Sequence, residues 1–224
     1  MPTERFNKIK QVLLHRQPDL TVLVEAVDKP HNLSAIARTC DAVGIAELHA
    51  VSDISGLKLS QKAAGGIRKW LKLTKHKTTV LAFEQLKATG MQLVVTHLSE
   101  ATKDYKEIDY TRPTAIIAGS ESEGVSDYAI EHADHCIAIP MLGMAQSLNV
   151  SVAVSVILYE ALQQRQQADM YATLRLDPHS YKTKLFEGMH PKVTQYCRQR
   201  QQPYPQMDDD GNIIGDVFNL NNQR

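Results

Sequence analysis

The stretch LTVLVEAVDKPHNLSAIARTCDAVG, residues 20–44, decides the fold class. Its first part, residues 20–27, is almost continuously apolar and predicts a buried strand. Over residues 32–43 the apolar side chains recur at helical spacing, and Gly44 predicts the end of that helix. The connection between the two reads DKPHN and contains no glycine. A strand therefore leads into a helix without the phosphate-binding turn of a dinucleotide fold.

The same alternation continues along the chain. Apolar runs predict further strands at residues 47–51, 92–98, 114–118 and 136–140, and periodic segments predict helices at 78–89, from near 126, and at 149–167. Alternating elements with buried strands fold as a mainly parallel sheet with helices on both faces. The predicted fold class is α/β.

Both ends of the chain depart from this pattern. Residues 3–16 predict an amphipathic helix with Phe6, Ile9, Leu13 and Leu14 on one stripe. We expect three segments: a basic helix over residues 1–19, a main domain over 20–167, and a basic helical extension with an acidic tail over 168–224.

The composition is that of a globular protein whose charges are unevenly distributed. The net charge of the 224 residues is zero, but residues 53–77 carry +6 and residues 78–162 carry −7. Three cysteines are too few and too scattered for a disulfide framework or a metal knuckle. The charged N-terminus does not resemble a signal peptide, and no apolar run has the length of a membrane span. We expect a soluble, cytoplasmic protein without a membrane segment.

The glycines indicate where a ligand binds. The chain lacks the GxxxxGK[ST] motif of a P-loop, and its glycines occur late, as Gly119 and Gly124 after residues 114–118 and as Gly143 after residues 136–140. In an open parallel sheet, ligands bind beyond the carboxyl ends of the strands. Two such loops after neighbouring strands would form one pocket.

Three separated segments carry a specific resemblance. They read KPHNLSAIARTCDAVG over residues 29–44, IIAGSESEGVS over residues 116–126, and IPMLGMAQSLNVSVAVSVILYE over residues 139–160. Together they resemble the SPOUT superfamily of knotted methyltransferases, in particular its TrmH branch. With its short N-terminal helix and basic extension, the whole chain is similar to the tRNA guanosine-18 2'-O-methyltransferases. The resemblance to the related ribosomal RNA methyltransferases covers the main domain alone.

This resemblance implies a trefoil knot in the C-terminal part of the main domain, a homodimer, and S-adenosylmethionine as the cofactor. In the family the cofactor is held largely by backbone groups of three loops. This explains why the chain lacks the glycine motif of a dinucleotide-binding fold. The implied substrate is tRNA, methylated on the ribose of guanosine 18 in the D-loop. The implied cofactor-binding residues are Thr96, Leu98, Gly119, Glu121, Ile139, Met144 and Leu148.

The resemblance also implies a catalytic set. A ribose 2'-hydroxyl is a weak nucleophile, so the protein must orient two ligands and manage one proton. Arg38 is then either deprotonated in special surroundings or a cation that binds the adjacent phosphate and stabilises the developing alkoxide. Ordinary roles stay open for this set: Asn32 and Ser147 or Asn149 as helix N-caps, Glu121 as a loop acid, and Arg38 as a solvated helix residue. The implied catalytic residues are Asn32, Arg38, Glu121, Ser147 and Asn149.

Basic residues near both ends predict phosphate contacts to RNA. Two functions compete with methylation of guanosine 18: 2'-O-methylation of ribosomal RNA or another tRNA position, and RNA binding without catalysis. His132 and His135 have no third ligand in the pattern, so no metal site is expected. The expected RNA-binding residues are Arg5, Lys8, Lys10, Arg16, Lys192, Arg198 and Arg200.

Overall fold

The chain forms two compact units in the computed structural model, which describes residues 3–27, 29–51, 67, 70–99, 102–120 and 123–215. One unit is Gln17–Tyr171, and the other combines Met1–Arg16 with Ala172–Arg224. The N-terminal helix and the C-terminal extension, at opposite ends of the sequence, therefore belong to the same unit.

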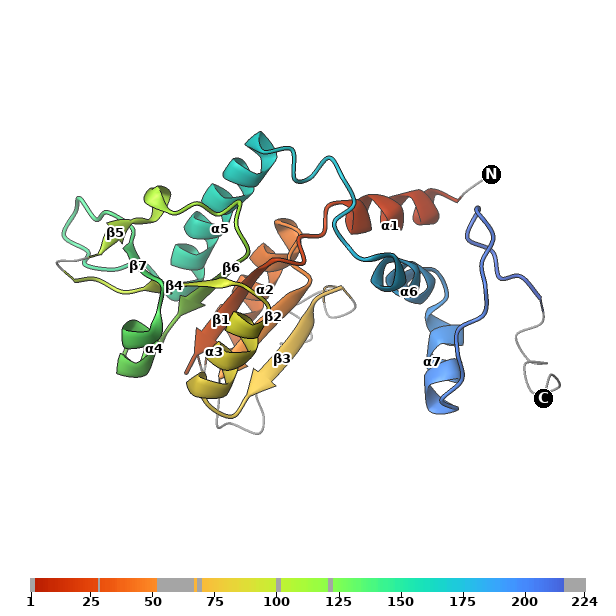
Figure 1. Cartoon of the computed structure of the whole chain (residues 1–224), viewed down its shortest axis with the longest axis horizontal. Helices are drawn as coiled ribbons and strands as arrows, with labels where there is room; N and C mark the ends of the chain where they lie inside the picture. Colours follow the sequence, from red (N-terminus) through yellow and green to blue (C-terminus); the bar gives the residue numbers. More distant parts are fainter. Residues whose placement is uncertain are drawn as a thin grey trace. The chain divides into compact units, whose positions relative to one another are not determined.

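The larger unit is built on a seven-stranded parallel sheet (Figure 1). Neighbouring strands are parallel throughout, in the order β3-β2-β1-β6-β4-β7-β5. The prediction of an α/β fold with a mainly parallel sheet is confirmed. The strands are β1 (Leu20–Glu25), β2 (Glu47–Val51), β3 (Lys72–His76), β4 (Gln92–Thr96), β5 (Lys103–Asp104), β6 (Thr114–Ala118) and β7 (His135–Ala138).

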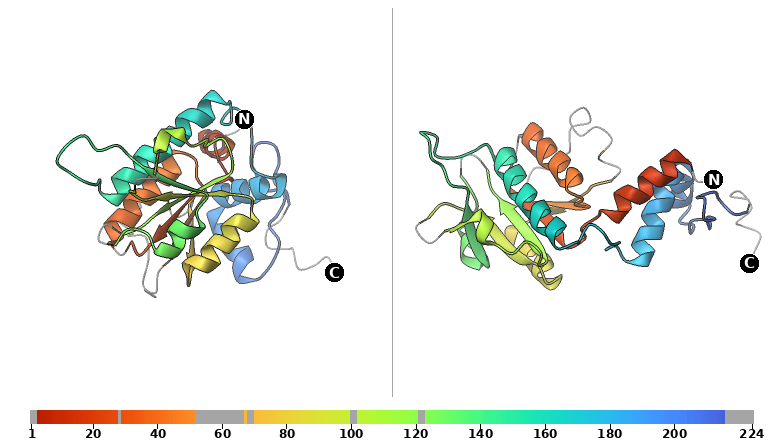
Figure 2. Two further views of the ribbon diagram at one scale, coloured as in Figure 1. Left: turned by 60° about the vertical axis from the view of Figure 1, so that its left-hand side comes forward. Right: turned by 90° about the horizontal axis from the view of Figure 1, so that it is seen from above.

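Helices cover both faces of this sheet (Figure 2). Alternate residues of β1 point to opposite faces, as the period of a strand requires. Val22 and Val24 pack in one core with residues of α2 and α5, whereas Leu23 packs in a second core with residues of α3 and α4. The four helices are α2 (Pro30–Ala42), α3 (Thr79–Ala88), α4 (Asp127–His132) and α5 (Val150–Gln167).

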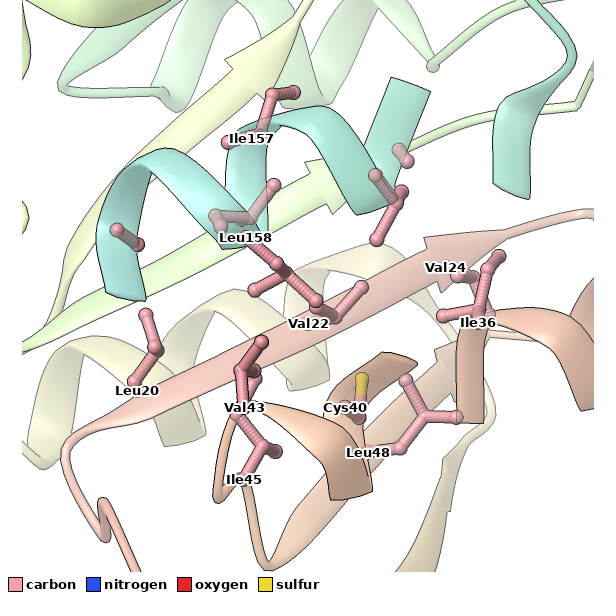
Figure 3. Close-up of a cluster of buried hydrophobic side chains, with 14 of the residues drawn as sticks. Leu20, Val22, Val24, Ile36, Cys40, Val43, Ile45, Leu48, Ile157 and Leu158 are labelled. Carbon is pink, nitrogen blue, oxygen red and sulfur yellow. The ribbon is translucent and has the colours of Figure 1, made fainter. Parts of the chain in front are cut away.

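The first of these cores explains why residues 20–44 decide the fold. Every residue of β1 is buried, as expected for a central strand of a parallel sheet. Helix α2 begins at Pro30, whose missing N–H needs no partner there, and its last turn is followed by Gly44 at φ 86°. Between these ends its apolar stripe faces β1 and α5, and Figure 3 shows Ile36 of α2 beside Val24 of β1.

Two strands were not expected from the sequence. Lys72–His76 forms the edge strand β3, although its sequence KLTKH carries three basic side chains and no apolar run. The residue pair Lys103–Asp104 forms β5 at the opposite edge, and the 3-10 helix η2 (Tyr105–Glu107) follows it. An edge strand buries less than a central one, so charged residues are tolerated there and the hydrophobic signal is lost.

A buried arginine holds the amino ends of two central strands. The Arg165 side chain, on the last turns of α5, is fully buried and forms an ion pair with Asp19 at 2.7 Å. Its guanidinium also donates to the Gln17 side chain at 3.0 Å and to the carbonyl oxygens of Tyr110 at 2.8 Å and Arg112 at 3.1 Å. These partners precede β1 and β6, so the interaction ties α5 to the base of the sheet.

We expect Arg165→Ala to lower the free energy of unfolding by about 3–5 kcal/mol, because it leaves a carboxylate and several carbonyl groups without their partner. Urea denaturation would measure the loss. The matched control is Arg198→Ala, which breaks the exposed pair with Glu187 at 2.6 Å and should cost less than about 1 kcal/mol. Equal losses in the two variants would contradict this account.

A buried histidine pair lies between β2 and β3. The Nδ1 atom of His49 is 2.9 Å from the Nε2 atom of His76, and the two rings stack. His49 is 5% exposed, and burial lowers its pKa from 6.5 to about 4. Its neutral form is therefore favoured in the folded state, and protonation favours unfolding between these two pH values.

Stability should fall as the pH decreases from about 6.5 to 4. From the two pKa values of His49 we expect it to contribute a loss of about 2 kcal/mol between pH 7.5 and pH 5. Urea denaturation of the parent and of His49→Gln at both pH values checks this. The variant should lose less stability on acidification, and an equal loss in both proteins would show that another group is responsible.

The smaller unit consists of α1 (Glu4–Leu14), α6 (Pro178–Met189), α7 (Pro191–Gln199) and the chain that follows them. The Thr3 side chain caps α1 by accepting from the Phe6 N–H at 3.2 Å, and α1 packs against α6. Phe6 also packs against Gly211, where an added Cβ would lie 2.5 Å from the Phe6 ring. Helices thus form toward both ends of the chain and belong to one unit.

Candidate functional site

A cavity of about 890 Å³ opens beyond the carboxyl ends of β4, β6 and β7. These three strands are neighbours in the sheet, so the segments that follow them meet at one edge. The cavity lies within the size range of small-molecule sites, roughly 300–1,000 Å³. Its walls are residues 96–98, 102–104, 118–120 and 137–141, together with Gly124, Gly143, residues 145–148 and the first turns of α5.

The loop after β6 forms one wall of the cavity and needs glycine at its start. Ser120 and Gly124 pair across the loop: the N–H of each donates to the carbonyl oxygen of the other, with both N···O distances at 3.0 Å. A Cβ atom on Gly119 would lie 1.8 Å from the Gly124 carbonyl oxygen and 2.4 Å from the Val125 nitrogen. Backbone atoms therefore occupy the space that a side chain would take, and Gly119, Ser120 and Gly124 line the cavity.

The structure brings together most of the residues expected to bind the cofactor. Thr96, Leu98, Gly119, Ile139 and Leu148 all line the cavity. Met144 does not, and its side chain is fully exposed. Glu121, which was expected to serve both the cofactor and catalysis, lies outside the described residues.

Two of the expected catalytic residues, 117 positions apart in the sequence, contact each other. The Nδ2 atom of Asn149 donates to the Oδ1 atom of Asn32 at 3.2 Å. Asn149 also caps α5, because its Oδ1 atom accepts from the Ser151 N–H at 2.9 Å. Asn32 is buried and does not cap α2, whose N-cap is Lys29. The ordinary role as a helix cap thus holds for Asn149, which in addition orients Asn32.

The two other described members of the catalytic set are exposed. Ser147 lies on the cavity wall, two residues before the cap of α5. Arg38 lies on α2, exposed and six residues after Asn32. The next residue on α2, Thr39, hydrogen-bonds Ser155 of α5 at 2.9 Å, which fixes the register of the two helices. The start of α5 thus carries Asn149, which contacts Asn32, and Ser147 lies two residues before it. Arg38 lies on the adjoining helix α2.

Sequence reasoning missed part of the cavity wall. His97, Thr102, Lys103, Asp104 and Gln146 also line it. Thr102 closes the turn after β4 by donating to the His97 carbonyl at 3.1 Å and accepting from the Ser99 N–H at 2.9 Å. His97 and Gln146 lie within loops that the resemblance implies for the cofactor, residues 96–99 and 139–148, although neither is in the implied cofactor-binding set. The others depend on the two-residue strand β5, for which the sequence carries no signal.

The basic residues expected to bind RNA fall into different environments, all in the smaller unit. Lys8 and Lys192 are exposed, and Arg200 is exposed with its guanidinium stacked 3.9 Å above the Tyr196 ring. Arg16 is 1% exposed. The remaining three make surface contacts: Arg5 with the Gly188 carbonyl at 2.8 Å, Lys10 with the Phe6 ring, and Arg198 with Glu187.

Among the described residues, no group of three or more His, Cys, Asp or Glu side chains is placed to hold a metal ion. Within the same part of the chain, no helix combines the length and apolar character needed to span a membrane.

A parallel sheet with a cavity beyond its strand ends has the architecture in which α/β proteins ordinarily bind a small molecule. The chain belongs to the SpoU rRNA Methylase family, whose model matches residues 19–159, and the model named SpoU, rRNA methylase, C-terminal matches residues 163–216. The predicted membership in the SPOUT, TrmH-type family is confirmed by these matches.

Individual relatives agree with the family assignment. The chain is 46% identical over 219 residues to the tRNA (guanosine(18)-2'-O)-methyltransferase of Escherichia coli K12, covering 97% of this chain and 96% of the relative. It is similar to the crystal structure of the Aquifex aeolicus TrmH/SpoU tRNA modifying enzyme, with a TM-score of 0.78, 40% identity, and coverage of 83% and 94%.

A third relative was solved with a ligand. The SpoU methyltransferase AviRb from Streptomyces viridochromogenes, in complex with the cofactor AdoMet, superposes with a TM-score of 0.60 and 28% identity. The match covers 69% of this chain and 61% of that protein. A member of the same fold therefore binds this cofactor.

Proposed function

We propose that this protein transfers a methyl group from S-adenosylmethionine to the ribose 2'-hydroxyl of guanosine 18 in the D-loop of tRNA. The observation that carries the proposal is the likeness to the Escherichia coli guanosine-18 methyltransferase, which extends over 97% of the chain. It includes the smaller unit as well as the sheet and the cavity. A non-catalytic RNA-binding protein would have no need of such a cavity together with Asn32, Arg38 and Asn149.

The cavity fits S-adenosylmethionine. It is large enough for a nucleoside derivative, and Gly119 allows the backbone of residues 124 and 125 to approach closely, so that main chain forms this part of the wall. The half-buried side chains of Ile139 and Leu148 give apolar cover, and Thr96 and Leu98 complete the wall. When bound, the cofactor supplies an electrophilic methyl group on a sulfonium.

The chain's own residues then have separate tasks. Arg38 contacts the target ribose and its phosphate, either taking the 2'-hydroxyl proton or stabilising the developing alkoxide as a cation. Asn32 and Asn149 hold each other and fix the start of α5. Ser147 and Glu121 orient the loops around the cavity. Isothermal titration calorimetry tests the cofactor assignment: S-adenosylhomocysteine should bind and ATP should not, and comparable affinity for ATP would remove the basis of the proposal.

We include the trefoil knot in the proposal, and the strand order supports it. Strand β6 lies between β1 and β4, whereas β7 lies on the far side of β4. The chain after β7 nevertheless returns to α5, which packs against α2 beside the central strands. Residues 139–149 must therefore cross back over the carboxyl end of the sheet, where a knotted path would bring the three cavity loops together.

A homodimer is likewise part of the proposal. Leu142 and Met144 beside the cavity are fully exposed, and Val152 and Tyr159 on α5 are about half exposed. Large exposed apolar side chains are often found at interfaces, and a second copy would cover these four. A partner chain would also bring a second Arg38 toward the cavity, so that each site is shared between two chains.

Mixing two inactive variants tests this shared site. Arg38→Ala and Asn149→Ala dimers should each be nearly inactive. After co-refolding in equal amounts, random pairing gives about half mixed dimers with one intact site each, so about a quarter of the parent activity should return. If mixed dimers form and remain inactive, Arg38 and Asn149 act within one chain.

The smaller unit is proposed to bind the tRNA backbone. Arg16 is left out of this surface because it is buried, and Arg198 is already paired with Glu187. The exposed residues Lys8, Lys192 and Arg200 carry the proposal.

The free cysteines, two of them buried, suit a reducing compartment, and we propose that the protein works in the cytoplasm.

We expect Lys8→Gln combined with Lys192→Gln to weaken tRNA binding and to reduce the slope of log affinity against log salt concentration by about 2, because each phosphate contact contributes about 0.9. Affinities measured between about 50 and 200 mM KCl give the slope. Lys87→Gln, an exposed lysine on α3 of the larger unit, is the control and should leave the slope unchanged. An unchanged slope in the double variant would remove these residues from the RNA interface.

A further inference from the structure

A buried carboxylate at the end of β1 is not explained by the catalytic set or by the cavity lining. Glu25 is the last residue of this strand and is 5% exposed. The chain turns sharply after it, with Ala26 at φ 50°. A carboxylate in such a place destabilises the fold unless hydrogen-bond donors surround it. The groups that donate to the Glu25 carboxylate therefore indicate its structural role.

These donors come from two other segments. The hydroxyl of Thr79, the first residue of α3, donates to the Oε1 atom of Glu25. The Ser126 N–H donates to Oε2 at 3.0 Å, and the Ser126 hydroxyl donates to Oε1 at 3.0 Å. Glu25 thus links the end of the central strand to α3 and to the residue that precedes α4.

Ser126 couples this carboxylate to the cavity loop. Its hydroxyl oxygen accepts from the Ala129 N–H at 3.2 Å and so caps α4. The Glu25 contact therefore fixes both the start of α4 and the last residue of the loop after β6. Gly124, two residues earlier, lines the cavity and is paired with Ser120. The loop is held at Gly119 by β6 and at Ser126 by Glu25.

We propose that Glu25 is a positioning residue for the cofactor. Glu25 does not line the cavity and acts through Ser126, keeping the backbone groups of Gly119, Ser120 and Gly124 in place before the cofactor binds. Preorganisation of this kind matters most where backbone groups provide the contacts, because a loop that must first be ordered binds more weakly. The inference rests on the proposed function, since it assumes that the cavity holds S-adenosylmethionine.

The test compares Glu25→Gln with Thr79→Val. The amide keeps the shape of the side chain but replaces one acceptor oxygen by an NH₂ group that cannot accept from Ser126 or Thr79. Thr79→Val removes the contact on the α3 side and leaves both Ser126 contacts intact. We expect Glu25→Gln to raise the Kd of S-adenosylhomocysteine about tenfold or more, and Thr79→Val to change it less than about threefold.

A second readout separates positioning from general damage. In Glu25→Gln the KM for S-adenosylmethionine should rise with the Kd, while the Kd for tRNA stays at the parent value. A merely structural role would lower the melting temperature without changing the cofactor Kd below that temperature, and this result would overturn the proposal. Equal changes in cofactor and tRNA binding would overturn it too.

If Glu25→Gln does not fold, Ser126→Ala replaces it, because this variant keeps the backbone contact and loses one hydroxyl. A cofactor Kd raised about threefold or more supports the proposal, and a parent-like Kd overturns it. Failure of the proposed function is distinguishable, since the parent protein itself would then not bind S-adenosylhomocysteine.

Discussion

Arg38→Ala should lower kcat for tRNA methylation about 100- to 1,000-fold, the usual effect of removing one group that stabilises developing charge in a transition state. The affinity for S-adenosylhomocysteine should stay at the parent value, because Arg38 does not line the cavity of its own chain. Single-turnover methylation with saturating tRNA and calorimetry with the cofactor product measure the two quantities separately.

Two further variants sharpen this prediction. Arg112→Ala removes another exposed arginine of the same unit and should keep kcat within about twofold, as expected for a surface site. Arg38→Lys keeps the positive charge but loses the planar guanidinium and its paired N–H donors. Partial recovery of activity would favour the role as a cationic phosphate anchor, and no recovery would favour the guanidinium as the proton acceptor. An Arg38→Ala enzyme as active as Arg112→Ala would remove Arg38 from the site.

Gly119→Ala should raise the Kd of S-adenosylhomocysteine about tenfold to 100-fold. The added methyl group would lie 1.8 Å from the Gly124 carbonyl oxygen, so the backbone of the loop must move. Backbone atoms cannot move aside as a flexible side chain can. The clash therefore displaces the loop that forms this wall of the cavity. Calorimetry on the folded variant, with its folding checked by circular dichroism, gives the measurement.

Gly143→Ala is the matched control. Gly143 lines the same cavity, but an added Cβ there meets no atom within 4 Å. We expect its cofactor Kd to change less than about threefold, because an open position tolerates a methyl group. Similar effects at the two glycines, or no effect at Gly119, would contradict the cavity assignment.

The central part of the fold could be predicted from the sequence because its signals are local. The apolar run of β1, the periodicity of α2 and the glycine that follows α2 each lie within a few residues of the element they define. Strands β3 and β5 could not be predicted in this way. The first is a charged edge strand, and the second has two residues that pair with β7 through contacts far along the chain.

The site could be predicted in part for the same reason. Loops at strand ends carry local clusters of glycine, and this pattern predicts a ligand site at Gly119. The contact between Asn32 and Asn149 joins positions far apart in the sequence, and spacing alone cannot give it. The sequence predicts Arg16 at the end of an amphipathic helix, where a basic residue is ordinarily exposed, but α1 ends at Leu14 and the packing beyond it buries Arg16.

One measurement tests the central claim most directly. A tRNA transcript with guanosine 18 is incubated with the protein and S-adenosylmethionine carrying a labelled methyl group, digested to nucleosides and analysed by mass spectrometry. A second transcript carries adenosine at position 18. The account predicts label in 2'-O-methylguanosine from the D-loop of the first transcript and none in the second. Label in a base, at another position, or in ribosomal RNA but not tRNA would contradict it.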